Sequence, residues 1–85
     1  MFFVYILKSK KDRVLYFGYT NNLRKRLKEH NLGLVKPTKS RKPLYLVYYE
    51  AYASKQDAVK RKHNLKLRAK ALRQLKNRIK GSLKA

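Results

Sequence analysis

Cysteine is absent from this sequence, and acidic residues, proline and glycine are scarce, with four, two and three of 85 residues. Without cysteine the chain has no disulfide, no thiolate zinc site and no cysteine nucleophile, which is typical of a reducing compartment. Long apolar runs are missing as well. Met1–Leu7 is too short for a signal-peptide core and far short of the roughly 20 residues that span a bilayer. We therefore expect a soluble, cytoplasmic protein.

Positive charge is what the sequence has in excess. Lysine and arginine number 24 against Asp12, Glu29, Glu50 and Asp57, and the formal net charge is +20. So large a charge repels itself and predicts a polyanionic partner, with nucleic acid as the first candidate. Hydrophobic residues make up 44% and recur in patterned runs, so we expect a folded chain rather than a disordered polycation. A chain of 85 residues fits a single domain with one modest core.

The first third of the sequence predicts a β-hairpin and a short helix. Phe2–Leu7 and Val14–Tyr19 are rich in aromatic and β-branched residues and are separated by a polar cluster. This connection is too short for a crossover, so the two strands should pair antiparallel. Thr20-Asn21-Asn22 offers N-caps for a short helix, roughly Asn22–Asn31, and Gly33 is expected to end it.

A basic loop, a strand and the start of a second helix follow. Both prolines lie in the loop of residues 36–43, for which we expect no regular structure. Leu44–Glu50 returns to strand composition. Ser54, with Asp57 three residues later, has the spacing of a capping box and predicts the start of a helix.

The C-terminal part of the chain predicts basic helix. Ala58–Leu83 carries an apolar stripe among lysines and arginines, which predicts one long helix or two helices joined near residues 66–70. The fold class is therefore α+β, in the order β-β-α-β-α with the last helix whole or split. Within the single domain 1–85, residues 1–53 should form the sheet and first helix, and residues 54–83 the basic helices.

Three short motifs occur in order along the first part of the chain. They are Val4-Tyr5-Ile6, then Tyr16-Phe17-Gly18, then Leu23-x-x-Arg26-x-x-x-His30. In this combination the sequence resembles the GIY-YIG nuclease superfamily, in particular its small stand-alone bacterial members, over roughly two-thirds of the chain. The resemblance implies a three-stranded antiparallel sheet flanked by helices. It also implies hydrolysis of a DNA phosphodiester with a divalent metal, Mg²⁺ or Mn²⁺.

The resemblance assigns catalytic roles to five residues. Tyr5 would activate or orient the attacking water, and Tyr16 would be the second tyrosine of the site. Gly18 would leave space beside the scissile phosphate. Arg26 would stabilise the charge of the transition state, and His30 would support the network around the nucleophile. Arg26 and His30 are four residues apart and so share one helix face.

The metal ligand expected from the resemblance is missing. The glutamate that the family carries on the helix after the third strand aligns with Lys62, and an ammonium group repels a cation. Asp12 is expected in the hairpin turn, Asp57 in a helix cap, and Glu29 off the face of Arg26 and His30, which leaves Glu50 as a weak substitute. The Lys62 ammonium itself could take the place of the metal ion, or catalysis could be lost and binding kept.

A basic surface is the second predicted feature. Lysine or arginine occupies ten positions from Lys60 to Lys80, with no acid after Asp57, which goes beyond what solubility requires. Two polar residues follow the glycine of the second motif, where the resemblance implies phosphate contact, and Asn77 loosely matches a polar residue of the family. We expect nucleic acid to be bound by Tyr19, Thr20, Lys36, Lys39, Arg41, Lys60, Arg61, Lys66 and Asn77.

Structural alternatives exist for several of these residues. Tyr5 and Tyr16 also fit half-buried strand tyrosines, and His30 also fits a residue that complements the helix dipole. His63 fits a surface histidine, and two histidines without acids make no zinc site.

Three functions stay open: a metal-dependent DNA endonuclease, a catalytically impaired domain that only binds DNA or RNA, and a basic helix that acts at a membrane surface or binds RNA as ribosomal proteins do. The short aliphatic stripe disfavours the membrane. The expected partner is DNA, intact, branched or damaged, or RNA, bound by a monomer.

Overall fold

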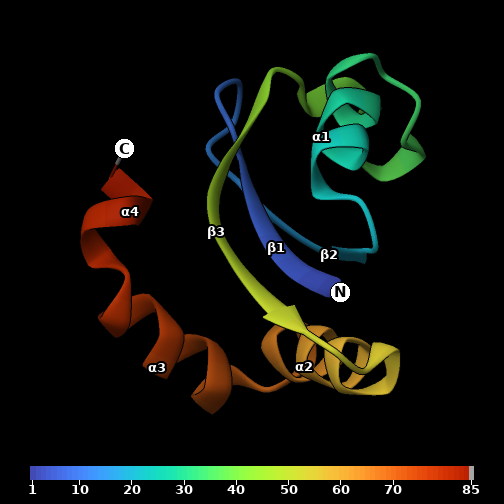
Figure 1. Cartoon of the computed structure of the whole chain (residues 1–85). Helices are drawn as coiled ribbons and strands as arrows, with labels where there is room; N and C mark the ends of the chain where they lie inside the picture. Colours follow the sequence, from blue (N-terminus) through green and yellow to red (C-terminus); the bar gives the residue numbers. More distant parts are fainter. Residues whose placement is uncertain (85) are drawn as a thin grey trace.

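Three antiparallel strands form the centre of the molecule in the order β2-β1-β3 (Figure 1). The structure is a computed structural model that describes residues 1–84. The strands are β1 (Phe2–Ser9), β2 (Leu15–Thr20) and β3 (Leu44–Tyr52). The central strand β1 places Tyr5 opposite Gly18 of β2 and Tyr49 of β3. A register shift between Ile6 and Leu7 separates the two halves of the β1–β3 pairing.

The helices cover both faces of this sheet (Figure 1). Helix α1 (Leu23–Asn31) and the 3-10 helix η1 (Lys36–Arg41) lie on one face. Helices α2 (Lys55–Leu67), α3 (Ala69–Arg78) and α4 (Lys80–Lys84) follow β3 and pack on the other face. None of the helices in residues 1–84 is long and apolar enough to cross a membrane.

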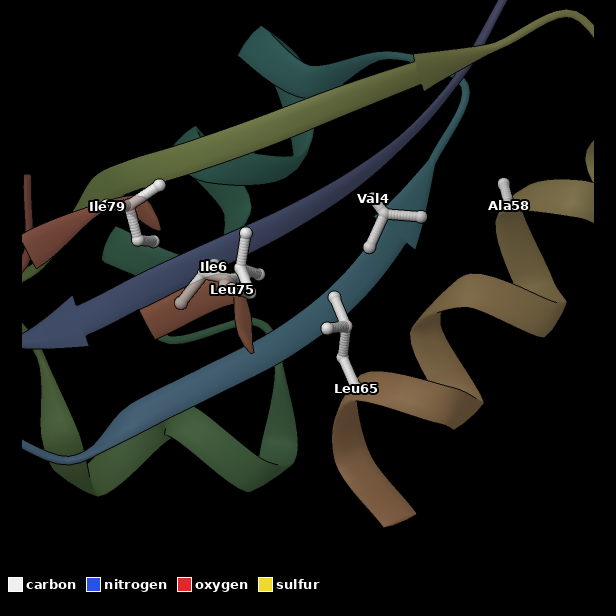
Figure 2. Close-up of a cluster of buried hydrophobic side chains, with 6 residues drawn as sticks. All are labelled: Val4, Ile6, Ala58, Leu65, Leu75 and Ile79. Carbon is white, nitrogen blue, oxygen red and sulfur yellow. The ribbon is translucent and has the colours of Figure 1, made fainter. Parts of the chain in front are cut away.

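Alternation along β1 produces two apolar clusters, because successive side chains of a strand point to opposite faces. Val4 and Ile6 pack against α2 and α3 through Ala58, Leu65 and Leu75 (Figure 2). The second cluster, on the face of α1, contains Tyr5, Leu7 and Leu44, with Leu23 and Leu27 of α1 packed against it. The tyrosine of the first motif is therefore part of a buried layer under α1.

Local signals in the sequence explain the limits of α1. The Asn22 side chain accepts a hydrogen bond from the backbone N–H of Lys25 at 3.1 Å. At the other end Gly33 adopts a φ of 76°, the left-handed region that glycine enters without strain. The N–H groups of Gly33 and Leu34 bond the carbonyls of His30 and Glu29, which is the Schellman pattern. The predicted α+β fold and this helix are confirmed.

Two segments differ from the sequence expectations. Residues 36–41 form the 3-10 helix η1 rather than an irregular loop, because Pro37 stands in the first turn, where no N–H is needed. The predicted break in the basic segment falls at Arg68, whose φ of −115° and ψ of 106° are extended. A further short helix, α4, was not predicted.

Candidate active site

Tyr5 and Gly18 meet at the centre of the sheet. The side chain of Tyr5 is 1% exposed and lies on the face covered by α1. A Cβ atom at Gly18 would lie 2.4 Å from the Tyr5 hydroxyl oxygen, closer than any real contact. Gly18 therefore makes room for the phenol of Tyr5. This role differs from the one that the resemblance implies, which is space beside a phosphate.

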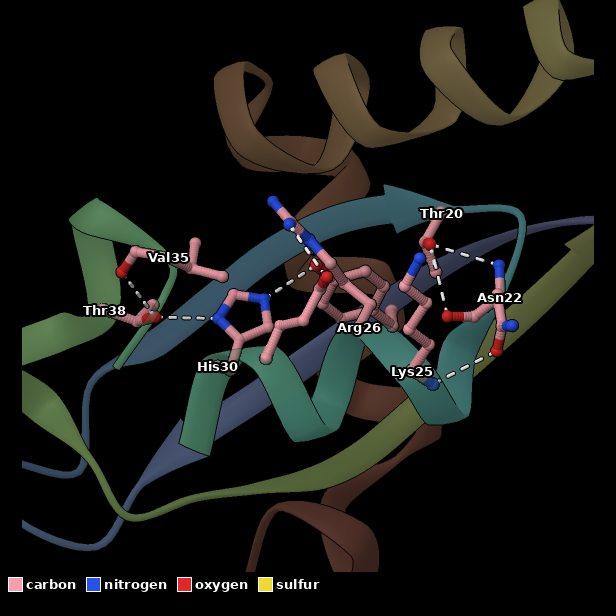
Figure 3. A network of polar contacts seen from close by, with 9 residues as sticks. Thr20, Asn22, Lys25, Arg26, His30, Val35 and Thr38 are labelled. Atoms are coloured by element: carbon pink, nitrogen blue, oxygen red, sulfur yellow. Dashed lines mark hydrogen bonds and ion pairs between the residues drawn. The ribbon is translucent and has the colours of Figure 1, made fainter. Parts of the chain in front are cut away.

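A chain of buried polar groups extends from Tyr5 to η1 (Figure 3). The Tyr5 hydroxyl lies 2.9 Å from His30 Nε2, and His30 Nδ1 lies 2.7 Å from Thr38 Oγ1. Thr38 in turn donates to the carbonyl oxygen of Val35 at 3.3 Å. His30 and Thr38 are fully buried. The chain joins the first motif, the α1 histidine and a residue of the basic loop.

The bond from the Thr38 hydroxyl to the Val35 carbonyl determines the direction of the other hydrogen bonds in this chain. A hydroxyl has a single proton, and Thr38 donates it to a carbonyl, which only accepts. His30 Nδ1 must then donate to Thr38, so Nε2 of the neutral ring is an acceptor. Tyr5 consequently donates to His30 and keeps its lone pairs for other donors.

The pKa values of both groups agree with this neutral arrangement. Burial lowers the pKa of His30 to about 4, and the nearby Arg26 charge lowers it further. Burial raises the pKa of Tyr5 to about 12, although a hydrogen bond with Arg26 opposes the shift. At neutral pH the site holds a neutral phenol and a neutral imidazole. Ionising Tyr5 would require an additional positive charge close by.

Tyr16 completes an aromatic cluster around His30. Its ring centroid lies 4.9 Å from that of His30 and 6.4 Å from that of Tyr5. Tyr16 is half-buried and comes from β2, opposite Leu7 of β1. The two motif tyrosines and the α1 histidine are therefore brought together by three separate elements.

Arg26 lies at the partly exposed side of this cluster. Its guanidinium Nη1 is 3.2 Å from Glu29 Oε1, and the two side chains are 38% and 31% exposed. The expectation that Glu29 lies off the Arg26 face is wrong, because residues three apart on a helix are neighbours. Arg26 thus bonds Tyr5 on one side and Glu29 on the other.

Lys62 of α2 lies beside the second motif. Its ammonium nitrogen lies 5.7 Å from the ring centroid of Tyr19, within the range of a cation–π contact. Tyr19 follows Gly18 in β2. Arg26 bonds Tyr5, the strand partner of Gly18, on the face covered by α1. Tyr19 pairs with Val4, so Lys62 lies on the other face, and the two cations flank the edge strand β2 from opposite sides of the sheet.

A divalent metal does not fit the residues present. Within residues 1–84 no group of three histidine, aspartate or glutamate side chains could hold a metal ion. The Glu50 carboxylate accepts two hydrogen bonds from Arg61, at 2.9 and 3.0 Å, and one each from Tyr48 and Tyr52. Because Glu50 pairs with Val4, it faces α2 and α3, on the opposite side of the sheet from Tyr5. Its position and its four donors make it a poor metal ligand.

The predicted nucleic-acid contacts do not form one cluster. Those of η1 lie beside α1, whereas those of α2 and α3 lie across the sheet (Figure 1). Arg61 is bound to Glu50, and Arg41 pairs with Asp12 at 3.6 Å. The Thr20 hydroxyl bonds the backbone of Asn22. The remaining basic and amide side chains are exposed: Lys36, Lys39, Lys60, Lys66 and Asn77.

Thr38 and Glu29 are the site residues that the sequence did not indicate. Thr38 stands in a lysine-rich loop, and nothing in its spacing shows that it reaches His30 eight residues earlier. Glu29 offered one signal, because its three-residue spacing from Arg26 suffices for an ion pair.

Comparison with known proteins shows to which family a chain with this site belongs. The sequence profile of the GIY-YIG catalytic domain matches residues 1–77. The chain belongs to the GIY-YIG family. This is a nuclease family, so the buried Tyr5–His30 pair and Arg26 lie in a domain of catalytic type.

Relatives of similar length share this GIY-YIG domain. A UPF0213 protein of Clostridium perfringens is 49% identical over 67 residues, covering 78% of this chain and 71% of that protein. One from Staphylococcus aureus is 44% identical over 79 residues, covering 89% and 95%. The solution structure of a UPF0213 protein from Bacillus halodurans, 37% identical, superposes with a TM-score of 0.54 over 88% of this chain and 82% of that one. The chain is thus similar to small stand-alone GIY-YIG proteins.

Proposed function

We propose that this GIY-YIG domain binds DNA without a metal ion, with a backbone phosphate held between Arg26 and Lys62 beside the second motif. The observation that carries this proposal is that Arg26 of α1 bonds Tyr5, the strand partner of Gly18, while the Lys62 ammonium of α2 lies 5.7 Å from the ring centroid of Tyr19. Arginine suits such a site because its forked donors match phosphate oxygens. Lysine suits it as a point charge.

The charge of the whole chain supports this assignment. Its net charge of +20 repels metal cations and attracts a polyanion over the whole surface. Exposed lysines on α2 and η1 lie on two sides of the domain, where they can neutralise further phosphates. Such contacts fix position rather than sequence, so we expect weak sequence preference.

DNA binding in a metal-free buffer tests the proposal. Fluorescence anisotropy with a labelled duplex in EDTA compares the natural chain with Arg26→Ala and Lys62→Ala. Lys25→Ala and Lys55→Ala are matched controls, because each removes an exposed lysine from the same two helices, α1 and α2. We expect the first two variants to lose clearly more affinity than the controls. Equal losses in all four variants would contradict a phosphate site at this position.

DNA endonuclease activity is the second candidate function. It is favoured by the intact chain from Tyr5 through His30 to Thr38. In this scheme a water bonded to Tyr5 attacks phosphorus, the bond from phosphorus to the leaving oxygen breaks, and the leaving oxygen takes a proton from solvent. The water gives its proton to Tyr5, which passes its own proton to Nε2 of His30. A pKa near 4 makes His30 a weak acceptor, so the cations beside the site must favour this transfer.

Plasmid nicking distinguishes the two candidates. The assay compares the natural chain with Tyr5→Phe and Lys62→Glu, in EDTA and with Mg²⁺ or Mn²⁺. Nicking by the natural chain that Tyr5→Phe abolishes would establish the endonuclease. No nicking by the natural chain, with metal-dependent nicking by Lys62→Glu, would show that only the metal ligand is missing and that the natural chain is a binder.

A further inference from the structure

A hollow of about 490 Å³ opens between α1 and the edge strand β3. Its lining is mainly apolar and includes Phe3 and Tyr49 from the sheet and Leu23 and Leu27 from α1. Its volume falls within the roughly 300–1,000 Å³ that is usual for small-molecule sites. Neither Tyr5 nor His30 lines the hollow, although Leu23 and Leu27 of its lining also pack against Tyr5.

Tyr49 presents an aromatic ring at this hollow. It is 53% exposed, and its ring centroid lies 6.0 Å from that of Phe3 in an edge-to-face arrangement. The ring contacts Phe3 while part of its surface stays open to solvent. An exposed aromatic ring is the kind of surface on which unpaired nucleobases stack.

The charge of the hollow favours nucleic acid over a second copy of this chain. Among residues 1–84, Arg24 is the charged residue of the lining, and no acidic residue of this range lines the hollow. A second copy would bring another +20 charge to the same place. DNA brings phosphates for Arg24 together with flat apolar bases for Tyr49.

The hollow also lies close to the proposed phosphate site. Tyr49 is the strand partner of Tyr5, and Tyr5 is the strand partner of Gly18. Two strand spacings, about 10 Å, therefore separate Gly18 from Tyr49. Asn21 and Asn22, which connect β2 to α1, line the hollow, so it opens where the chain leaves the second motif.

We infer that this hollow receives an unpaired base of a DNA strand, stacked on Tyr49, while the backbone of that DNA lies at Arg26 and Lys62. This inference rests on the proposed function and deepens it, because it names the substrate class as DNA with an unpaired base. Fully paired duplex would then bind through phosphate contacts alone.

Two DNA probes isolate the contribution of the base. One is a duplex with a single unpaired thymine, and the other is the same duplex with an abasic residue at that position. Both have the same phosphates. Stacking of one base on an aromatic side chain predicts roughly 5- to 150-fold tighter binding of the thymine probe. Tyr49→Val should remove this difference, and Tyr49→Phe should keep it. Tyr45→Val is the matched control, because Tyr45 lies on the same strand and faces the other side of the sheet.

Each outcome is decisive. Preference for the thymine probe that only Tyr49→Val abolishes supports the inference. Equal binding of both probes by the natural chain overturns it and leaves the phosphate site standing. Binding of neither probe overturns both proposals. A dimer in sedimentation that Tyr49→Val dissociates, without base preference, would assign the hollow to a second copy and overturn the inference.

Discussion

Stability of this domain should depend on pH through His30. Its folded pKa of about 4 lies below the ordinary value of 6.5, because burial disfavours the charged ring. Between these two values the unfolded chain binds a proton that the folded chain does not. Stability must therefore fall as the pH is lowered from about 6.5 towards 4.

The loss of stability can be calculated from the difference between the folded and ordinary pKa values of His30. One pKa unit corresponds to about 1.4 kcal/mol, so the whole shift is worth about 3 kcal/mol, and about 2 kcal/mol of it is lost between pH 7 and pH 4.5. Carboxylates change the free energy of unfolding only at lower pH. The pKa of Glu50 is lowered from 4.5, since its hydrogen bonds with Arg61 and the two tyrosines outweigh the effect of burial, so its stabilisation is lost only below about 4.5. The window above pH 4.5 therefore reports mainly His30.

Urea unfolding followed by circular dichroism at pH 7 and pH 4.5 measures this loss. The comparison is between the natural chain, His30→Gln and His63→Gln, the last being a control at an exposed histidine of α2. His30→Gln should be less stable at pH 7 but nearly independent of pH across the window. The reasoning is refuted if the natural chain keeps the same free energy of unfolding at both pH values, or if His30→Gln shows the same loss as the natural chain.

Three further substitutions test the packing around the site, each by its unfolding free energy. Gly18→Ala places a methyl group 2.4 Å from the Tyr5 hydroxyl and should cost about 1–3 kcal/mol; an unchanged stability would show that the ring is not held there. Glu50→Gln weakens the paired charge beside Arg61 and should cost about 2–3 kcal/mol with or without Mg²⁺, whereas a cost that Mg²⁺ alone produces would indicate a metal ligand. Gly33→Ala should cost about 1 kcal/mol at a φ of 76°, with a neutral result ruling out strain.

Local patterns made most of the fold predictable. The hairpin strands, the Asn22 cap and the Gly33 stop are each encoded by neighbouring residues, and all three are present in the structure. The 3-10 helix runs against the expectation that two prolines exclude regular structure, because Pro37 fits a first helical turn. The start of α4 was missed because the apolar stripe continues past Arg78 without a signal for a break.

The candidate site was predictable only where motif residues form it. Tyr5, Tyr16 and His30 are brought together as expected. Thr38 was not predicted, because a contact between a loop and a helix depends on how the chain turns back after Gly33. The bonds of Glu50 were equally hidden, since Arg61 lies eleven residues away in another element.

The salt dependence of DNA affinity in EDTA tests the central claim most directly. Each phosphate neutralised contributes about −0.9 to the slope of log affinity against log salt. The account predicts a steep slope for the natural chain, and a slope smaller by about 1 for Arg26→Ala and for Lys62→Ala. A flat response, or DNA binding that needs a divalent metal, would contradict a metal-free phosphate site at these two cations.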